Sequence, residues 1–170
     1  MSGEPLASTP ADGDRAPDGS EGAARALTAA DLVGTWRLLT WTSVGDDGVT
    51  HPMGERPEGV LVYTADGTMI TTHGRPGRPR IDSVDMHGGP ERQRLEAMTT
   101  FFAYSGRFSI DGDDVLHAVA MSLFPNWVGT VQRRHVRLSA DGNQLTLSAD
   151  PFVVRGRLGT QVLTWERVSP

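Results

Sequence analysis

The sequence has no cysteine, and this absence excludes several classes of protein. Without thiols the chain holds no disulfide framework, no thiolate zinc site, no iron–sulfur cluster and no cysteine nucleophile. No apolar run approaches the roughly 18 residues that a membrane-spanning helix needs. Basic residues are outnumbered as well, because 16 Lys and Arg face 21 Asp and Glu, for a net charge of −5.

A net negative chain lacks the basic surface that attracts nucleic acids and anionic membranes. We therefore expect no nucleic-acid partner and no membrane partner. A length of 170 residues suits one domain that closes its own hydrophobic core without metals or disulfides. The composition predicts a soluble, cytoplasmic protein that acts as a monomer or homodimer.

The N-terminal segment is poor in large apolar side chains. Leu6 is its only large aliphatic residue after Met1, and Ala, Gly, Pro, Ser, Asp and Glu dominate the first 26 residues. Such a segment buries too little apolar surface to offset the entropy of ordering it, so we expect a disordered tail over residues 1–27 and one domain over 28–170. Acidic residues at positions 4, 12 and 14 also argue against a secretory signal.

Period-two alternation of apolar and polar residues dominates the rest of the chain, and Gly and Asp-Gly turns interrupt it. This pattern predicts three hairpins and two further strands. The hairpins pair 59–64 with 68–73, 103–110 with 115–123, and 130–138 with 144–149, and the further strands cover 36–44 and 158–167. Because short turns join at least eight strands, we expect an all-β fold, an antiparallel barrel of eight to ten strands.

Two segments depart from the strand pattern. Thr28 is an N-cap candidate for a short helical turn before Leu32. Residues 90–102 combine strong helix formers with apolar residues at spacings of three and four, so we expect one amphipathic helix packed against the barrel. The loop over 74–89 is long enough to act either as a lid over the barrel mouth or as a mobile connection.

The alternation also predicts which side chains face the barrel interior. In 130–138 it places Gln132 and Arg134 on the inward face with Val136, while in 115–122 it groups His117 with apolar residues. An inward guanidinium must be paired or hydrogen-bonded, because burial of an unpaired charge is costly. Inward acidic residues are scarce, which favours ligand contact by Arg134 over an internal ion pair.

The expected lumen combines apolar walls with a few convergent polar groups, as small-molecule pockets do. For His117, a core histidine bonded to a tyrosine and a general acid or base are both open interpretations. The candidate catalytic residues are His117, Arg134 and Tyr104. The candidate substrate-binding residues are Tyr63, Met69, Phe108, Val119, Met121, Trp127, Gln132 and Val136.

Gly34-Thr35-Trp36 in the first strand and Trp165-Glu166-Arg167 in the last resemble the lipocalin signature. The chain more closely resembles the bacterial lipocalin-like domain family over most of 32–168. The specific part is the segment 122–130, Ser-Leu-Phe-Pro-Asn-Trp-Val-Gly-Thr. The resemblance implies a small β-barrel in which Trp36 packs at the closed end with Arg167 across it. Related small barrels occur in natural-product biosynthesis, where some cyclise polyketide-like chains.

Familiar catalytic motifs are absent from the sequence. There is no Gly-x-Ser-x-Gly elbow, no dinucleotide-binding glycine motif and no phosphate loop, and the five histidines are not spaced as local metal ligands. We therefore expect neither a cofactor nor a metal.

Two functional hypotheses remain. The first is a cofactor-independent enzyme of secondary metabolism that cyclises or isomerises an apolar, polyketide-like molecule in the lumen. Arg134, Gln132 or a tyrosine would polarise a carbonyl, and His117 or a tyrosine would move a proton. The alternative is a non-catalytic carrier that uses the same residues as specificity contacts. Convergence of the polar groups favours the enzyme, although both hypotheses need the same lumen.

Overall fold

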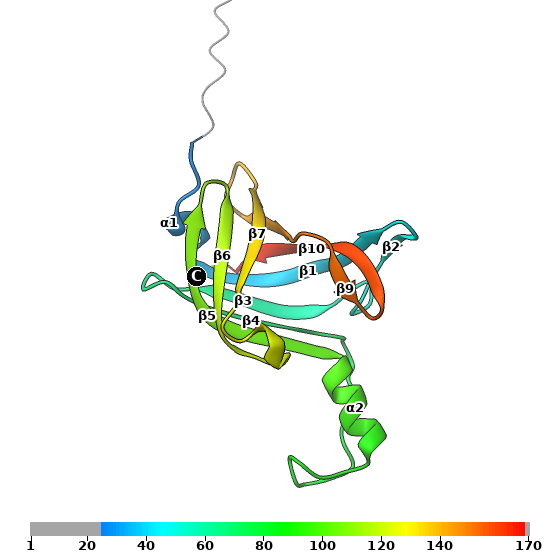
Figure 1. Cartoon of the computed structure of the whole chain (residues 1–170). Helices are drawn as coiled ribbons and strands as arrows, with labels where there is room; N and C mark the ends of the chain where they lie inside the picture. The colour runs from blue at the N-terminus through cyan, green and yellow to red at the C-terminus, as the bar shows by residue number, and fades with distance from the viewer. Residues whose placement is uncertain (1–24, 169–170) are drawn as a thin grey trace, which may run out of the picture.

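A computed structural model describes residues 25–168 of the chain, so the tail expected at residues 1–27 lies almost entirely outside the described residues. Eight antiparallel strands form a closed barrel, because the last strand pairs with the first (Figure 1). In sheet order they are β1 (Gly34–Gly45), β3 (Glu58–Tyr63), β4 (Thr68–Gly74), β5 (Phe101–Asp111), β6 (Asp114–Ser122), β7 (Val131–Leu138), β8 (Gln144–Ser148) and β10 (Arg157–Arg167). The predicted antiparallel lipocalin-like barrel is confirmed.

The three predicted hairpins are β3–β4, β5–β6 and β7–β8. Two short strands extend the sheet beyond the barrel, since β2 (Gly48–Thr50) pairs with β1 and β9 (Phe152–Val154) pairs with β10. These two strands were not predicted, because three residues are too few to show a periodic pattern. No helix within residues 25–168 is long and apolar enough to cross a membrane.

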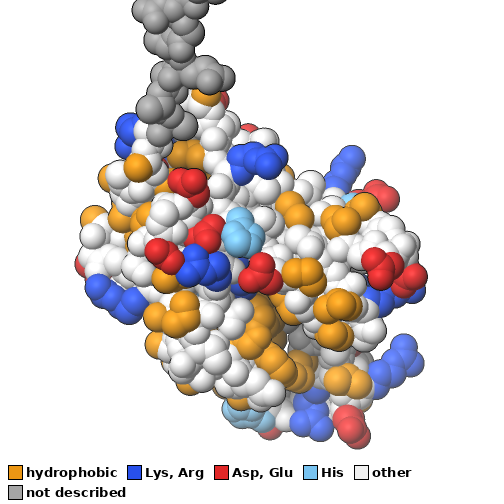
Figure 2. Space-filling model, turned by 45° about the horizontal axis from the view of Figure 1, so that its top comes forward, with side chains coloured by type: hydrophobic (Ala, Val, Ile, Leu, Met, Phe, Trp, Pro, Cys, Tyr) orange, Lys and Arg blue, Asp and Glu red, His pale blue; other side chains and the backbone are white. Residues whose placement is uncertain are grey.

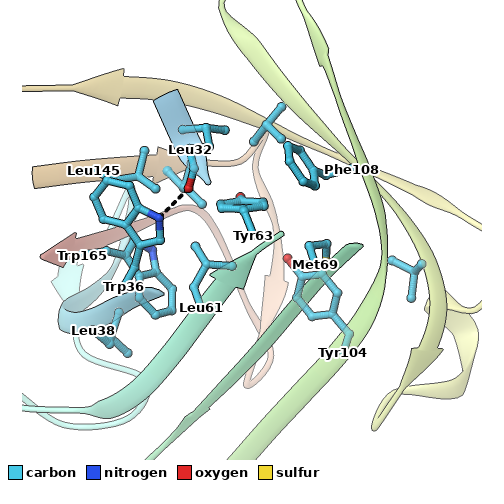
Figure 3. Close-up of a cluster of buried hydrophobic side chains, with 13 residues drawn as sticks. Leu32, Trp36, Leu38, Leu61, Tyr63, Met69, Tyr104, Phe108, Leu145 and Trp165 are labelled. Carbon is cyan, nitrogen blue, oxygen red and sulfur yellow. Dashed lines mark hydrogen bonds between the residues drawn. The ribbon is translucent and has the colours of Figure 1, made fainter. Parts of the chain in front are cut away.

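One end of the barrel is closed by the short helix α1 (Ala29–Leu32) and by Trp36. Trp36 is fully buried, and its indole N–H donates to the Leu32 carbonyl oxygen at 2.8 Å (Figure 3). The Arg167 guanidinium lies 4.1 Å from the centre of the Trp36 ring. Arg167 also donates to three carbonyl oxygens, those of Asp31, Val33 and Gly142. The expected contact between Trp36 and Arg167 is therefore confirmed.

The hydrophobic core continues from this closed end along the barrel interior (Figure 3). Alternate inward residues of neighbouring strands supply it, as the pleat of a β-strand requires. Among its members are Leu61, Tyr63, Met69, Phe108, Val115, Val119, Leu145 and Trp165. Toward the closed end, the barrel interior is therefore largely filled by side chains.

Helix α2 (Glu91–Thr99) differs from the prediction in two ways. It has no buried residue, and Leu95 and Met98 are exposed, so it is not packed against the barrel. It extends away from the barrel together with the preceding loop (Figure 1). The helix also ends earlier than expected, because Phe101 and Phe102 pair with Gly74 and His73 as the first residues of β5. Strand pairing here prevails over helical spacing.

A bulge in β6 changes the face of the residues that follow it. Ser105 and Gly106 of β5 pair with Met121 and Val119, which leaves Ala120 as the extra residue. Gly106 is required at this point, because a Cβ atom there would lie 1.9 Å from the Ala118 carbonyl oxygen. Since a bulge shifts the alternation by one residue, Met121 faces outward and is 70% exposed. The expectation that Met121 faces the lumen is wrong.

Candidate functional site

The barrel opens, away from the end closed by Trp36, into a cavity of about 590 Å³. This volume lies within the range of about 300–1,000 Å³ that is typical of small-molecule sites. Figure 2 shows hydrophobic side chains gathered around a hollow on the surface. The inner wall of the cavity comes from strands β1, β4, β5, β7 and β10. Its mouth is formed by β9, the end of α2 and residues 123–127.

Aromatic rings form much of the cavity wall. The ring of Trp127, in the short helix η1 (Pro125–Trp127), lies edge-on to three other aromatic rings. The distances between ring centres are 5.1 Å to Phe102, 5.5 Å to Tyr104 and 6.0 Å to Phe152. These spacings are typical of favourable edge-to-face contacts, so the rings hold one another in place in the cavity wall.

The polar side chains of β1 and β10 in this wall satisfy one another. Trp41 Nε1–H donates to Gln161 Oε1 at 2.9 Å. The amide of Gln161 donates to Ser43 Oγ at 2.8 Å and to the Gly159 carbonyl oxygen at 3.0 Å. Since both N–H groups of the Gln161 amide already have acceptors, this wall offers a ligand mainly apolar contact.

Arg134 supplies the buried charge of the cavity. It projects inward from β7 and is only 8% exposed, and its guanidinium lies 5.6 Å from the centre of the Trp127 ring. Nη1 donates to the neighbouring Arg133 carbonyl oxygen at 2.7 Å. None of the ion pairs among residues 25–168 includes Arg134, whereas the outward Arg133 pairs with both Asp111 and Asp114. The guanidinium also lies beside the Tyr104 hydroxyl, because a hydrogen bond from Arg134 is one of the causes that lower the pKa of Tyr104.

The two tyrosines of the chain both hydrogen-bond to one buried histidine. Tyr63 Oη lies 2.7 Å from His117 Nε2, and Tyr104 Oη lies 2.8 Å from His117 Nδ1. Burial, together with the nearby charge of Arg134, lowers the pKa of His117 to about 3. Burial also raises the pKa of both tyrosines, which Arg134 opposes. At neutral pH all three groups are therefore uncharged.

His73 lies between the large cavity and a smaller inner one of about 20 Å³. Its ring stacks on Phe102 at 5.5 Å and meets Trp41 edge-on at 5.2 Å. Burial lowers the pKa of His73 to about 3, with a further contribution from Arg134, so this ring is also neutral. The inner cavity is lined as well by Trp165, whose Nε1 is buried without a hydrogen-bond partner in residues 25–168.

The candidate residues from the sequence occupy five different places. Tyr104, Trp127 and Arg134 line the large cavity, and His117 lies behind Tyr104 beside the inner one. Gln132 is half-buried and donates to Thr130 Oγ1 at 2.9 Å. Four further candidates belong to the hydrophobic core, Tyr63, Met69, Phe108 and Val119, and Val136 packs against this core. Met121 lies on the outer surface.

The sequence analysis missed several residues of the cavity wall. His73 could have been found, because it shares an alternating face of its strand with Met69 and Thr71. Gln161 could also have been found, because it shares an alternating face of β10 with Trp165. Trp41 was harder to assign, because an irregularity between Leu38 and Thr40 shifts the alternation of β1. Other missed lining residues include Met53, Phe102, Leu123, Ala149, Phe152, Val154, Arg155 and Leu163.

A closed eight-stranded barrel with one open, apolar end and a tryptophan–arginine contact at the other is the arrangement expected for a lipocalin-like protein. The chain matches the family described as the lipocalin-like domain over residues 33–168. It belongs to this family. The lipocalin-like protein is also similar to the 4'-hydroxy-3'-methoxypropiophenone carrier protein ppsC of Aspergillus oryzae, at 33% identity over 102 residues. The match covers 55% of this chain and 91% of that relative.

Proposed function

We propose that this lipocalin-like protein binds a small, flat and largely apolar molecule in its cavity and carries it without changing it. The observation that supports this most is the position of Arg134, a buried cation without a carboxylate partner in residues 25–168, beside an aromatic wall. Apolar walls provide most of the affinity in such sites, and a few polar groups orient the ligand.

The chemistry of the cavity favours a carrier over a catalyst. Cyclisation and isomerisation need a group that accepts a proton, ideally one whose pKa lies near the working pH. The described lining residues include no carboxylate, and His73 has a pKa of about 3. His117 is an equally weak base and is separated from the large cavity by Tyr104. The cavity therefore offers hydrogen-bond donors but a poor general base.

The relative in Aspergillus oryzae supports the same role, because its name describes a carrier of an aromatic ketone. A molecule of that kind has a flat ring for the aromatic wall and an oxygen atom for Arg134. We extend to this chain the class of ligand, a compact aromatic compound with a polar oxygen, and a place in secondary metabolism.

A catalytic function, the cyclisation or isomerisation of a polyketide-like molecule, is the second candidate. It is favoured by the hydrogen-bonded series Tyr104–His117–Tyr63, because Tyr104 reaches the cavity and could donate its own hydroxyl proton to a bound substrate. Arg134 would stabilise the oxyanion that forms when a carbonyl is polarised.

Titration with 4'-hydroxy-3'-methoxypropiophenone, followed by tryptophan fluorescence and calorimetry, tests the carrier proposal. Leu163→Trp fills the cavity from β10 and should abolish binding, whereas Val162→Trp adds the same side chain on the opposite face of the strand and should not. Ala149→Leu is a smaller second filling variant in case Leu163→Trp fails to fold. Equal binding by the wild type and both filling variants would contradict the proposal.

The same incubations separate the two candidate functions. Mass spectrometry and NMR of the recovered compound should show it unchanged if the protein is a carrier. A new isomer or cyclised product that forms with the wild type, but not with Tyr104→Phe, would establish the catalytic alternative instead.

A further inference from the structure

We propose that the cavity selects an oxyanion: its ligand is a ring-sized apolar molecule with one phenolate, enolate or carboxylate oxygen, which accepts hydrogen bonds from Arg134 and from the Tyr104 hydroxyl together. This inference rests on the proposed binding function and adds to it the charge of the ligand and the residues that recognise that charge.

The charge of the cavity is the first argument. Among the described lining residues, the charged side chains are Arg134 and Arg155, and no carboxylate accompanies them. Arg155 lies at the mouth, where it donates to the Thr99 carbonyl oxygen at 2.8 Å. The cavity is therefore positive in a chain whose net charge is −5. A buried guanidinium without an anion is costly, and a bound oxyanion would supply the missing charge.

The direction of the hydrogen bonds around His117 is the second argument. Tyr63 is 1% exposed, and His117 Nε2 is the one partner of its hydroxyl in residues 25–168. A buried hydroxyl proton needs an acceptor, so Tyr63 donates to Nε2. A neutral imidazole then carries its proton on Nδ1, and Nδ1–H donates to Tyr104 Oη. Tyr104 thereby has its own proton free to donate into the cavity that it lines.

The two donors together discriminate between kinds of ligand. A ligand amine or ammonium group would meet the Arg134 cation and a hydroxyl donor, which is unfavourable. A neutral ketone could accept both hydrogen bonds but would leave the charge of Arg134 uncompensated. An oxyanion satisfies both donors and the charge, and hydrogen bonds that involve an ionised group are roughly twice as strong as neutral ones.

A matched pair of probes tests this selection: naphthalene-2-carboxylate, which is ionised at neutral pH, and 2-acetylnaphthalene, which offers the same rings and a neutral carbonyl oxygen. Calorimetry should give an affinity for the carboxylate at least about tenfold higher than for the ketone. Arg134→Met should remove this preference while ketone binding persists. Arg137→Met is the control, because Arg137 is exposed on the same strand.

Tyr104→Phe removes only the hydroxyl and provides a second variant in case Arg134→Met fails to fold. It should lower the affinity for the carboxylate more than the affinity for the ketone. Equal wild-type affinities for the two probes, or an unchanged preference in Arg134→Met, would overturn oxyanion selection and leave the binding function in place. If the wild type binds neither probe nor the aromatic ketone tested above, both proposals fail.

Discussion

Mild acid should destabilise this lipocalin-like protein through its two buried histidines. Burial lowers the pKa of His73 and of His117 from 6.5 to about 3, and the charge of Arg134 adds to both shifts. Between these values the unfolded chain binds protons that the folded chain does not, so the free energy of unfolding must fall as the pH falls. The stability that both residues contribute is complete above pH 6.5 and is lost progressively down to about pH 3.

The size of the effect follows from the same shifts. A pH of about 5 lies roughly 1.5 units below the pKa that each histidine has in the unfolded chain. Protonation of each histidine there lowers the free energy of unfolding by about 2 kcal/mol, so the two together lower it by about 4 kcal/mol relative to neutral pH. That is a large part of the roughly 5–15 kcal/mol by which folded domains are usually stable. The pKa of Asp31 and that of Asp114 are both lowered from 3.8, so at about pH 5 these carboxylates are ionised in the folded and in the unfolded chain and add little to the loss. His135, half-exposed between Asp114 and Asp150, has a raised pKa and acts weakly in the opposite direction.

Urea unfolding followed by tryptophan fluorescence at about pH 7.5 and about pH 5 measures this loss. In His117→Gln, which retains a polar side chain without a titrating group, the loss should fall to about 2 kcal/mol. His135→Gln, the control at the surface, should leave the full loss in place. Equal stability of the wild type at the two pH values would refute the assignment of both histidines as neutral, buried groups.

Three further predictions concern other parts of the barrel. Trp36→Ala should lower the free energy of unfolding by about 3–5 kcal/mol, because it removes a fully buried ring on which the Arg167 guanidinium rests. Urea unfolding measures this loss, and a change below about 1 kcal/mol would contradict it. Nitrogen-15 NMR of His117 should show a protonated Nδ1 and an unprotonated Nε2. Tyr63→Phe should raise the population of the tautomer that is protonated on Nε2. A wild-type His117 protonated on Nε2 would refute the inferred directions of the two hydrogen bonds. Arg155→Asn should speed the binding of the uncharged 2-acetylnaphthalene in stopped-flow measurements, because it removes the hydrogen bond to Thr99 at the mouth, and asparagine tolerates the positive φ of 53°. An unchanged rate would show that this contact does not limit entry.

Local patterns predicted most of the barrel. The Asp-Gly and related turns set the three hairpins, and period-two alternation correctly placed Arg134 and His117 inside. The contact between Trp36 and Arg167 came from the family resemblance, because residues so far apart in sequence carry no local signal of pairing.

The errors arose where a distant partner decides the local structure. Met121 was assigned to the wrong face, because the bulge at Ala120 depends on close packing against Gly106, which the alternation of one strand does not reveal. Phe101 and Phe102 fit a helical spacing but pair with β4. The wall near Trp41 was missed for a similar reason, since it is assembled from β1, β10 and the short β9 across the barrel.

Closure of the barrel by β1 and β10 has a consequence for the order of folding. Arg37 and Glu166, which join these strands by an ion pair, are separated by 129 positions. During synthesis the edge of β1 that β10 will cover therefore stays unpaired until nearly the whole barrel has been made. Such long-range closure slows folding and leaves an exposed strand edge that is prone to aggregation. A circular permutant that joins the two strands by a short turn should fold faster than the natural order of the chain.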